Sequence, residues 1–185
     1  LYTIPAARAM QHTGRVVACE PGKKNHEVLL RHIAMNDAHN VRCYNCLVGD
    51  EEKTVSFYED VLSPSAMNSV ARTPKIAKKT DRYVQHDCRQ LTLDQICDTE
   101  SIEPQVVKVD VEGAELLVLR GARNVFSQAR PLVFLSVHPG RMSLLGHGPE
   151  DILRFLDSVG YELRMIDSSK PAEISFGEYI LAPRA

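Results

Sequence analysis

Four segments of the chain place polar or ionisable side chains where an apolar run ends. These are Glu20, the stretch Asn45–Asp50, Asp110 with Glu112, and Ser136 with His138. When strands alternate with helices along a chain, ligands bind beyond the carboxyl ends of the strands. We therefore expect these four segments to line one site.

The residue types in these segments suit ligand binding and proton transfer. A carboxylate at Glu20 can accept two hydrogen bonds from a ribose diol. His138 can take a proton from a hydroxyl near neutral pH, and Asp110 can do so as well. Together with Glu112 they could hold a divalent ion, but nothing in their spacing requires one, and we predict no metal site. For Glu115, an interaction with the dipole of the following helix is a sufficient role.

Hydrophobic periodicity predicts strands that alternate with helices. The expected strands cover residues 15–19, 41–48, 54–58, 105–110, 131–137, 161–166 and 176–182; the expected helices cover 2–10, a segment after Gly22, 113–126 and a segment after Pro149. Such alternation implies a mainly parallel sheet, but the last two strands have no helix between them and must pair antiparallel. The strand at 54–58 is expected to fold back as a hairpin. We predict one α/β domain over 1–185, a three-layer sandwich with a mostly parallel sheet and an antiparallel C-terminal strand.

Bulk composition argues against several classes of function. The formal charge of −2 gives no general attraction to nucleic acid or to an anionic membrane, and no apolar run is long enough to span a bilayer. Five cysteines without a framework spacing are typical of a reducing compartment, so we expect a cytoplasmic protein. We interpret the pair Cys43 and Cys46 as two ordinary strand residues.

Residues 60–82 interrupt the alternation of strands and helices. They are rich in Ser, Pro and Asn, and their basic residues are Arg72, Lys75, Lys78, Lys79 and Arg82. The composition predicts a surface loop. A sharper hypothesis is that this loop covers the acceptor site and favours an acceptor of acidic character.

One string of the sequence, from Val107 to Ala122, reads V-K-V-D-V-E-G-A-E-L-L-V-L-R-G-A. It resembles the signature of the FkbM-type methyltransferases and is the most specific part of the resemblance. The flanking strings 14–21, 91–97 and 130–139 and the closing string from Tyr179 also agree. The resemblance spans essentially the whole chain.

The resemblance implies a Rossmann-like enzyme that uses S-adenosylmethionine (SAM). Glu20 would hold the ribose of SAM, and the stretch around Asn45 to Val48, with Cys46, would border its adenine. Pro21 and Asp110 would also belong to the cofactor site. The family's glycine-rich loop would precede Leu1, so we expect an apolar strand and a glycine-rich turn upstream of the chain. That strand would lie between those at 15–19 and 105–110.

The resemblance also implies transfer of the methyl group to a hydroxyl oxygen of a small molecule or sugar. Asp110 and Glu112 would face the methionine end of SAM and the acceptor, and His138 would be the better candidate for the base. Ser136 stands where many members have an acid, which weakens a mechanism that needs a carboxylate at that strand end.

Two other functions fit parts of the sequence. A carboxylate after a strand also occurs in NAD(P)-dependent oxidoreductases, although no G-x-G-x-x-G string is present and the antiparallel ending is unusual for that class. A non-catalytic Rossmann-like binding module is the second alternative, because a fold does not fix a function.

Overall fold

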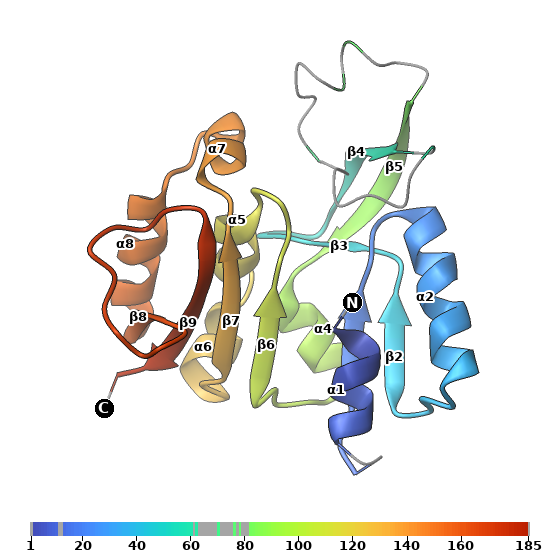
Figure 1. Ribbon diagram of the computed structural model, residues 1–185, viewed down its shortest axis with the longest axis horizontal. Helices are drawn as coiled ribbons and strands as arrows, with labels where there is room; N and C mark the ends of the chain where they lie inside the picture. The colour runs from blue at the N-terminus through green and yellow to red at the C-terminus, as the bar shows by residue number, and fades with distance from the viewer. Residues whose placement is uncertain are drawn as a thin grey trace.

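The computed structural model describes residues 2–10, 13–60, 62, 70, 76, 78 and 82–184. Strands and helices alternate over much of this part of the chain (Figure 1). The strands are β1 (Val16–Cys19), β2 (Val41–Tyr44), β3 (Leu47–Val48), β4 (Lys53–Asp60), β5 (Tyr83–Leu91), β6 (Val106–Val109), β7 (Leu132–Val137), β8 (Tyr161–Met165) and β9 (Gly177–Pro183). The helices are α1 (Thr3–Ala9), α2 (Lys23–Met35), α4 (Leu93–Glu100), α5 (Glu115–Arg120), α6 (Arg123–Gln128), α7 (Pro139–Met142), the 3-10 turn η1 (Ser143–Leu145) and α8 (Pro149–Val159).

The described strands form three sheets, of which one is a parallel pair and two are mixed. Their orders are β1-β2, β3-β5-β4 and β6-β7-β9-β8. Three strand pairs are parallel and three are antiparallel among the described residues, so the mostly parallel layout predicted from the sequence is not clearly shown. The predicted antiparallel ending is present, because β9 runs against both of its neighbours, β7 and β8.

The strand predicted at 41–48 is two strands in different sheets. Its first part, β2, pairs with β1, and its last part, β3, pairs with β5. Between them the Asn45 side chain donates hydrogen bonds to the carbonyls of Glu20 and Pro21, which holds the chain at the end of β1. The predicted hairpin from the turn at 49–52 is also wrong, because β4 pairs along its whole length with β5.

The helix predicted at 113–126 is broken in two at Gly121. A Cβ at this position would lie 1.9 Å from the carbonyl oxygen of Gly49, so only glycine permits this approach. The carbonyl of Gly121 also accepts from Asp94 N–H at the start of α4. The break therefore packs the α5–α6 segment closely against the chain that follows β3. We call the sheet to which β3 belongs, β3-β5-β4, the middle sheet.

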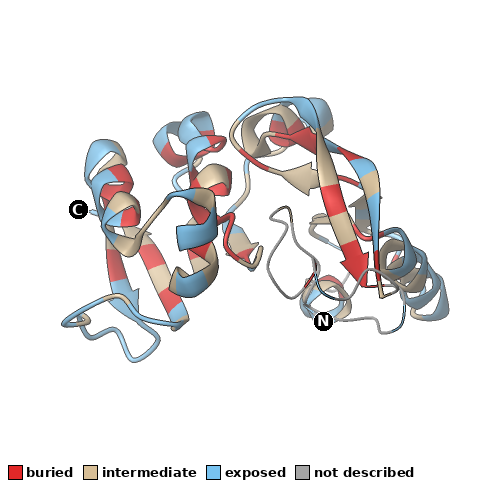
Figure 2. Ribbon diagram, turned by 90° about the horizontal axis from the view of Figure 1, so that it is seen from above, coloured by how far each residue is buried: buried red, intermediate tan, exposed pale blue. Residues whose placement is uncertain are grey.

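The main hydrophobic core lies in the C-terminal region, which we define as β6 to β9 with α5, α6 and α8. Its fully buried side chains come from β7 and from the inner faces of α5 and α8, and include Leu116, Leu135, Ile152 and Leu156. Helix α8 ends where predicted, at Gly160, which has a φ of 70°. In Figure 2 the buried positions follow these strands and helices, whereas α2, at the right edge, has none.

Most of the basic loop predicted at 60–82 lies outside the described residues, including Arg72, Lys75 and Lys79. Arg82 is described and forms an ion pair of 2.5 Å with the buried Asp60 carboxylate. In the described part of the chain, no helix is both long and apolar enough to span a bilayer.

Candidate active site

The structure brings Asp110, Glu112 and His138 together at the ends of two neighbouring strands. Asp110 follows β6, His138 follows β7, and these strands are parallel with Val109 opposite Leu135. His138 Nε2 lies 3.9 Å from Asp110 Oδ1 and 3.5 Å from Glu112 Oε2. One ligand atom from each side chain lies within 4.8 Å of the others, so the three residues could together hold a metal ion.

A tight turn places Glu112 beside this pair. Glu112 and Gly113 have φ values of 56° and 111°, in the left-handed region. A Cβ at Gly113 would lie 2.7 Å from the Cβ of Arg141 and 2.9 Å from its carbonyl carbon, so the turn needs glycine there. Burial raises the pKa of the Glu112 carboxyl, and Arg141, at 2.9 Å, opposes that shift.

Glu115 is a member of this site that the sequence reasoning missed. Its side chain is fully buried, and its Oε1 lies 2.7 Å from Nδ1 of His138. The backbone N–H of Gly113 donates to the same oxygen at 2.9 Å. The role of Glu115 therefore goes beyond an interaction with the helix dipole. A carboxylate three residues after Glu112 was the available signal, but its burial could not be read from the spacing.

The strand end at Ser136 does have a carboxylate beside it, supplied by the neighbouring strand. Ser136 lies opposite Glu178 of β9, and its hydroxyl donates to Glu178 Oε1 at 2.5 Å. Burial opposes ionisation of Glu178, but hydrogen bonds from Ser136 and Lys108 outweigh it and hold its pKa below the ordinary value. The Nζ of Lys108 also lies 4.0 Å from Asp110 Oδ2.

Glu20 ends β1 at the same edge of the fold. Figure 1 shows the arrowheads of β2, β6 and β7 pointing to one edge, and β1 runs parallel to β2. The Glu20 carboxylate accepts a hydrogen bond of 2.9 Å from Gly22 N–H, and burial raises its pKa. The structure brings Pro21 and Asn45 to this end of β1, whereas the Cys46 side chain packs into the core with Leu91 and Ile96.

The comparisons with known proteins identify the family. The FkbM methyltransferase domain matches residues 2–163. The chain belongs to this family. Among solved structures, the FkbM domain is similar to methyltransferase FkbM from Methylobacillus flagellatus KT, with a TM-score of 0.56 and 20% identity. That match covers 97% of this chain and 41% of the other, so the chain spans less than half of that protein and shares its fold. The comparison with curated proteins finds no match.

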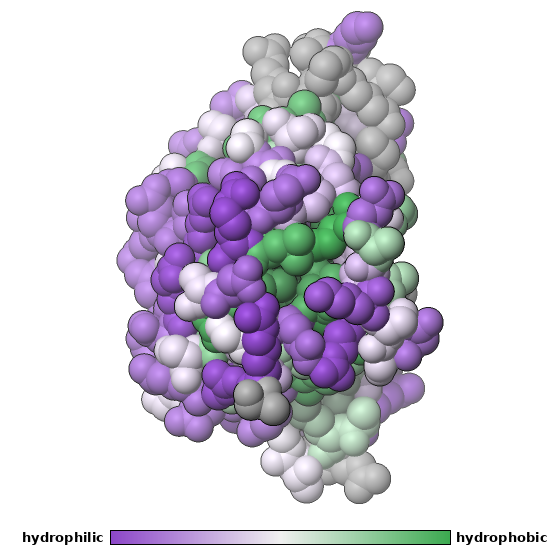
Figure 3. Space-filling model, turned by 90° about the vertical axis from the view of Figure 1, so that its left-hand side faces the viewer, coloured by the Kyte–Doolittle hydropathy of each residue, from purple (hydrophilic) through white to green (hydrophobic). Residues whose placement is uncertain are grey.

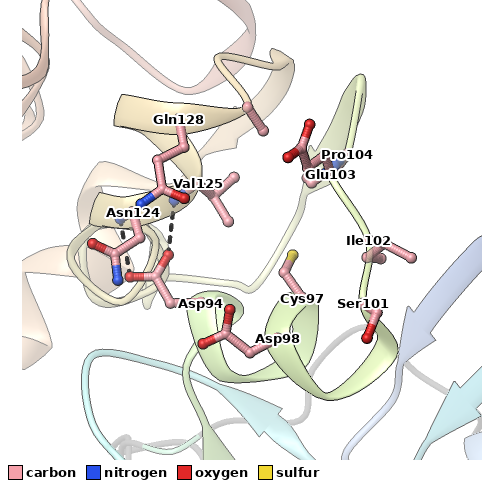
Figure 4. Close-up of a pocket in the computed structure, with 11 residues that line it drawn as sticks. Asp94, Cys97, Asp98, Ser101, Ile102, Glu103, Pro104, Asn124, Val125 and Gln128 are labelled. Atoms are coloured by element: carbon pink, nitrogen blue, oxygen red, sulfur yellow. Dashed lines mark hydrogen bonds between the residues drawn. The ribbon is translucent and has the colours of Figure 1, made fainter.

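The cavities found in the FkbM domain lie away from these side chains. One, of about 380 Å³, lies between α4 and α6 (Figure 4), where Asp94 accepts hydrogen bonds from the backbone of Asn124 and Val125. Another, of about 630 Å³, lies between α8, β8 and the segment at 168–174, and Figure 3 shows an apolar area rimmed by hydrophilic side chains on that side of the molecule. Neither is lined by a predicted site residue.

The cysteines of the FkbM domain add no further centre. All five are free thiols, and burial raises the pKa of Cys43 to about 11, so this thiol is neutral near pH 7. The described residues therefore offer two polar groups at one edge of the fold. One is Glu20 with Asn45, and the other is the set formed by Asp110, Glu112, Glu115 and His138, which we call the acidic-histidine cluster.

Proposed function

We propose that this FkbM domain transfers a methyl group from SAM to a hydroxyl oxygen of a small molecule or sugar. The observation that carries the proposal is the acidic-histidine cluster, where Asp110, Glu112 and His138 converge beyond two neighbouring strand ends. Ligands of open α/β sheets bind at such strand ends. Membership of a methyltransferase family gives the class of reaction.

Glu20 is proposed to bind the ribose of SAM. Its carboxylate is half-buried at the end of β1, where one oxygen accepts from Gly22 N–H. Carboxylate oxygens have further lone pairs that can accept the two ribose hydroxyls as charge-assisted hydrogen bonds. These accepting oxygens therefore fit the two hydroxyl groups of the SAM ribose. Pro21 would lie beside Glu20 in the cofactor site, and Asn45, with the backbone around Cys46, would border the adenine.

The acidic-histidine cluster is proposed to receive the acceptor hydroxyl. SAM, when bound, supplies a methyl group activated by its sulfonium, so the chain's own residues need only orient the acceptor and take its proton. His138 and Asp110 are the candidate bases, and general-base catalysis contributes roughly 10²–10⁴-fold. Glu112, fixed by its ion pair with Arg141, lies at the rim.

The Rossmann-like layout is also part of this proposal. Strands β1 and β6 each have one edge without a strand partner among the described residues, and in Figure 1 β6 lies on the opposite side of β1 from β2. The Tyr2 ring at the start of α1 lies 5.3 Å from Lys108 Nζ on β6. A further strand between β1 and β6 would join the two sheets into one.

Titration calorimetry with SAM, S-adenosylhomocysteine and NAD tests the proposed function. We expect the first two ligands to bind and NAD to give no heat beyond dilution. Binding of NAD alone would favour the oxidoreductase alternative. If a chain extended upstream of Leu1 bound none of the three, a non-catalytic module would be the better description.

A further inference from the structure

Glu115 and His138 form a buried pair within the acidic-histidine cluster. Glu115 is the first residue of α5 and its side chain is fully buried, while the His138 side chain is 13% exposed. A buried carboxylate is costly unless donors surround it. Here one oxygen, Oε1, accepts from Gly113 N–H and contacts His138 Nδ1 at 2.7 Å. The other oxygen, Oε2, is buried and has no hydrogen-bond partner among the described residues. The Gly113 N–H and the imidazole are therefore the two donors available to this carboxylate.

The contact decides which imidazole nitrogen carries the proton. An ionised carboxylate only accepts hydrogen bonds, and an oxygen that already accepts from a backbone N–H is best matched by a second donor. Nδ1 of His138 must then be the N–H nitrogen. In a neutral imidazole the other nitrogen, Nε2, is a bare acceptor.

Nε2 points toward the other two carboxylates of the cluster. Its nearest charged neighbours are Glu112 Oε2 at 3.5 Å and Asp110 Oδ1 at 3.9 Å, both beyond a normal hydrogen bond. No described residue forms a hydrogen bond with Nε2. The two carboxylates are close enough to stabilise an imidazolium by charge, yet they leave the Nε2 lone pair free for a ligand.

We propose that Glu115 is the positioning residue that holds His138 with its proton on Nδ1, so that Nε2 accepts the proton of the acceptor hydroxyl. This inference rests on the proposed methyl transfer. The acceptor oxygen bonds to the methyl carbon while the sulfur–carbon bond breaks and its electron pair stays on sulfur. The hydroxyl proton moves to Nε2, and the imidazolium later releases it to water. Asp110 and Glu112 stabilise the imidazolium, and Glu115 acts only through His138.

The test is the ring-nitrogen NMR spectrum of His138 in the chain, which needs neither SAM nor an acceptor. With uniformly ¹⁵N-labelled histidine at neutral pH, we expect Nδ1 to resonate as a protonated nitrogen and Nε2 as an unprotonated one. The signal is assigned by its loss in His138→Gln. A neutral ring with the proton on Nε2, or a ring protonated on both nitrogens at neutral pH, would overturn the proposal.

Two variants sharpen this measurement. In Glu115→Gln the side chain can donate as well as accept, so the preference for Nδ1–H should be lost and Nε2 should gain protonated character. The matched control is Glu59→Gln, a second buried glutamate, whose nearest ring nitrogen is His86 Nδ1 at 3.9 Å. It should leave the His138 signals unchanged. A Glu115→Gln spectrum identical to wild type would contradict the proposal, and if that variant does not fold, the wild-type spectrum decides alone.

Failure of the inference can be separated from failure of the proposed function. SAM binding by Glu115→Gln is measured by calorimetry in parallel, and we expect it to change less than about threefold, because Gly113 and His138 are the only described residues that form a hydrogen bond or ion pair with the Glu115 side chain. If the wild-type chain and its upstream extension bind no SAM, the proposed function fails whatever the tautomer. If SAM binds but the proton lies on Nε2, only the role of Glu115 fails.

Discussion

The C-terminal region and the N-terminal pair β1–β2 with α2 differ strongly in how far their apolar side chains are buried. The main core cluster contains 19 buried apolar residues, all within the C-terminal region except Cys97 of α4 and Met142 of α7, whereas the core cluster next to β1 contains three. All four residues of β1 are only half-buried, and none of the thirteen residues of α2 is buried. The apolar surface of the N-terminal pair is therefore only partly covered within the described part of the chain, where Val17, Cys19 and Tyr44 pack against the small cluster.

This difference in burial indicates which part of the fold is stabilised by contacts within the described chain. Burial of apolar surface contributes about 25 cal/mol per Å², so a half-covered strand receives only part of its stabilisation. An apolar strand with an unpaired edge is also a liability in a soluble protein. Val106 at the start of β6 shows the same incompleteness, because it is 54% exposed. We propose that the edges of β1 and β6 are completed by a strand encoded upstream of Leu1.

The largest effect is expected from extending the chain upstream. An added strand and turn should bury β1 and bring backbone N–H groups to the carboxylate end of SAM. We expect calorimetry to show SAM binding by the extended chain and poor or no binding by residues 1–185. Amide hydrogen exchange in β1 and α2 should slow in the extended chain and stay unchanged in β7.

Equal, tight SAM binding by both chains would contradict the proposal that an upstream strand completes β1 and β6. It would show that the cofactor site is complete within 1–185 and that β1 needs no further neighbour. A useful control is the extended chain with Glu20→Ala. That variant separates completion of the fold from direct contact with the ligand.

The next largest effect is expected in the C-terminal core. Leu135 is fully buried at the centre of β7, between β6 and β9. Leu135→Ala should lower the free energy of unfolding by about 2–5 kcal/mol, because it leaves a cavity that close packing cannot fill. Urea unfolding followed by circular dichroism measures this as a lower midpoint at an unchanged slope. A loss below about 1 kcal/mol would mean that this core is less tightly packed than its burial indicates.

A smaller effect is expected at Glu20. Glu20→Ala should weaken SAM binding by about 1.5–3 kcal/mol, the value of hydrogen bonds to a charged group. Since burial raises the pKa of this carboxyl, it takes up a proton at a higher pH than an ordinary glutamate. SAM affinity should therefore fall as pH is lowered through that raised pKa, and Glu20→Gln should flatten the dependence. A dissociation constant unchanged in Glu20→Ala would exclude ribose binding at this position.

The meeting of Asp110, Glu112 and His138 could be predicted from the sequence because it needs only two facts. Each strand end is visible as the end of an apolar run, and parallel neighbouring strands bring such ends together. The role of Glu115 could not be predicted in this way. Its burial depends on the left-handed backbone of Glu112 and Gly113, which turns the chain before α5 begins. The carboxylate beside Ser136 could not be predicted either, because it belongs to Glu178, which lies on a different strand, β9.

The middle sheet was the least predictable part of the fold. Strand β5 reads Y-V-Q-H-D-C-R-Q-L, with polar residues at most positions, so it shows no apolar alternation. Its stability comes from long-range pairing with β4 and β3, which no local pattern encodes. Because β5 shows no such pattern, the sequence predicts that β4 forms a hairpin with the strand before it, whereas β4 pairs with β5.

The smallest effect is expected on α2, where Leu29, Leu30, Ile33 and Ala34 share one face. Leu30 is 45% exposed, so Leu30→Ala removes little buried surface, and the free energy of unfolding of residues 1–185 should change by less than about 0.5 kcal/mol. Leu135→Ala is the matched leucine deletion and should cost several times more under the same urea conditions. The substitution should also cost little in the upstream-extended chain if the added strand covers β1 alone. A loss of about 2 kcal/mol in the extended chain only would show that the added segment also packs on α2. A similar loss in residues 1–185 would mean that α2 is already covered, and that the contrast between the two regions is smaller than their exposures indicate.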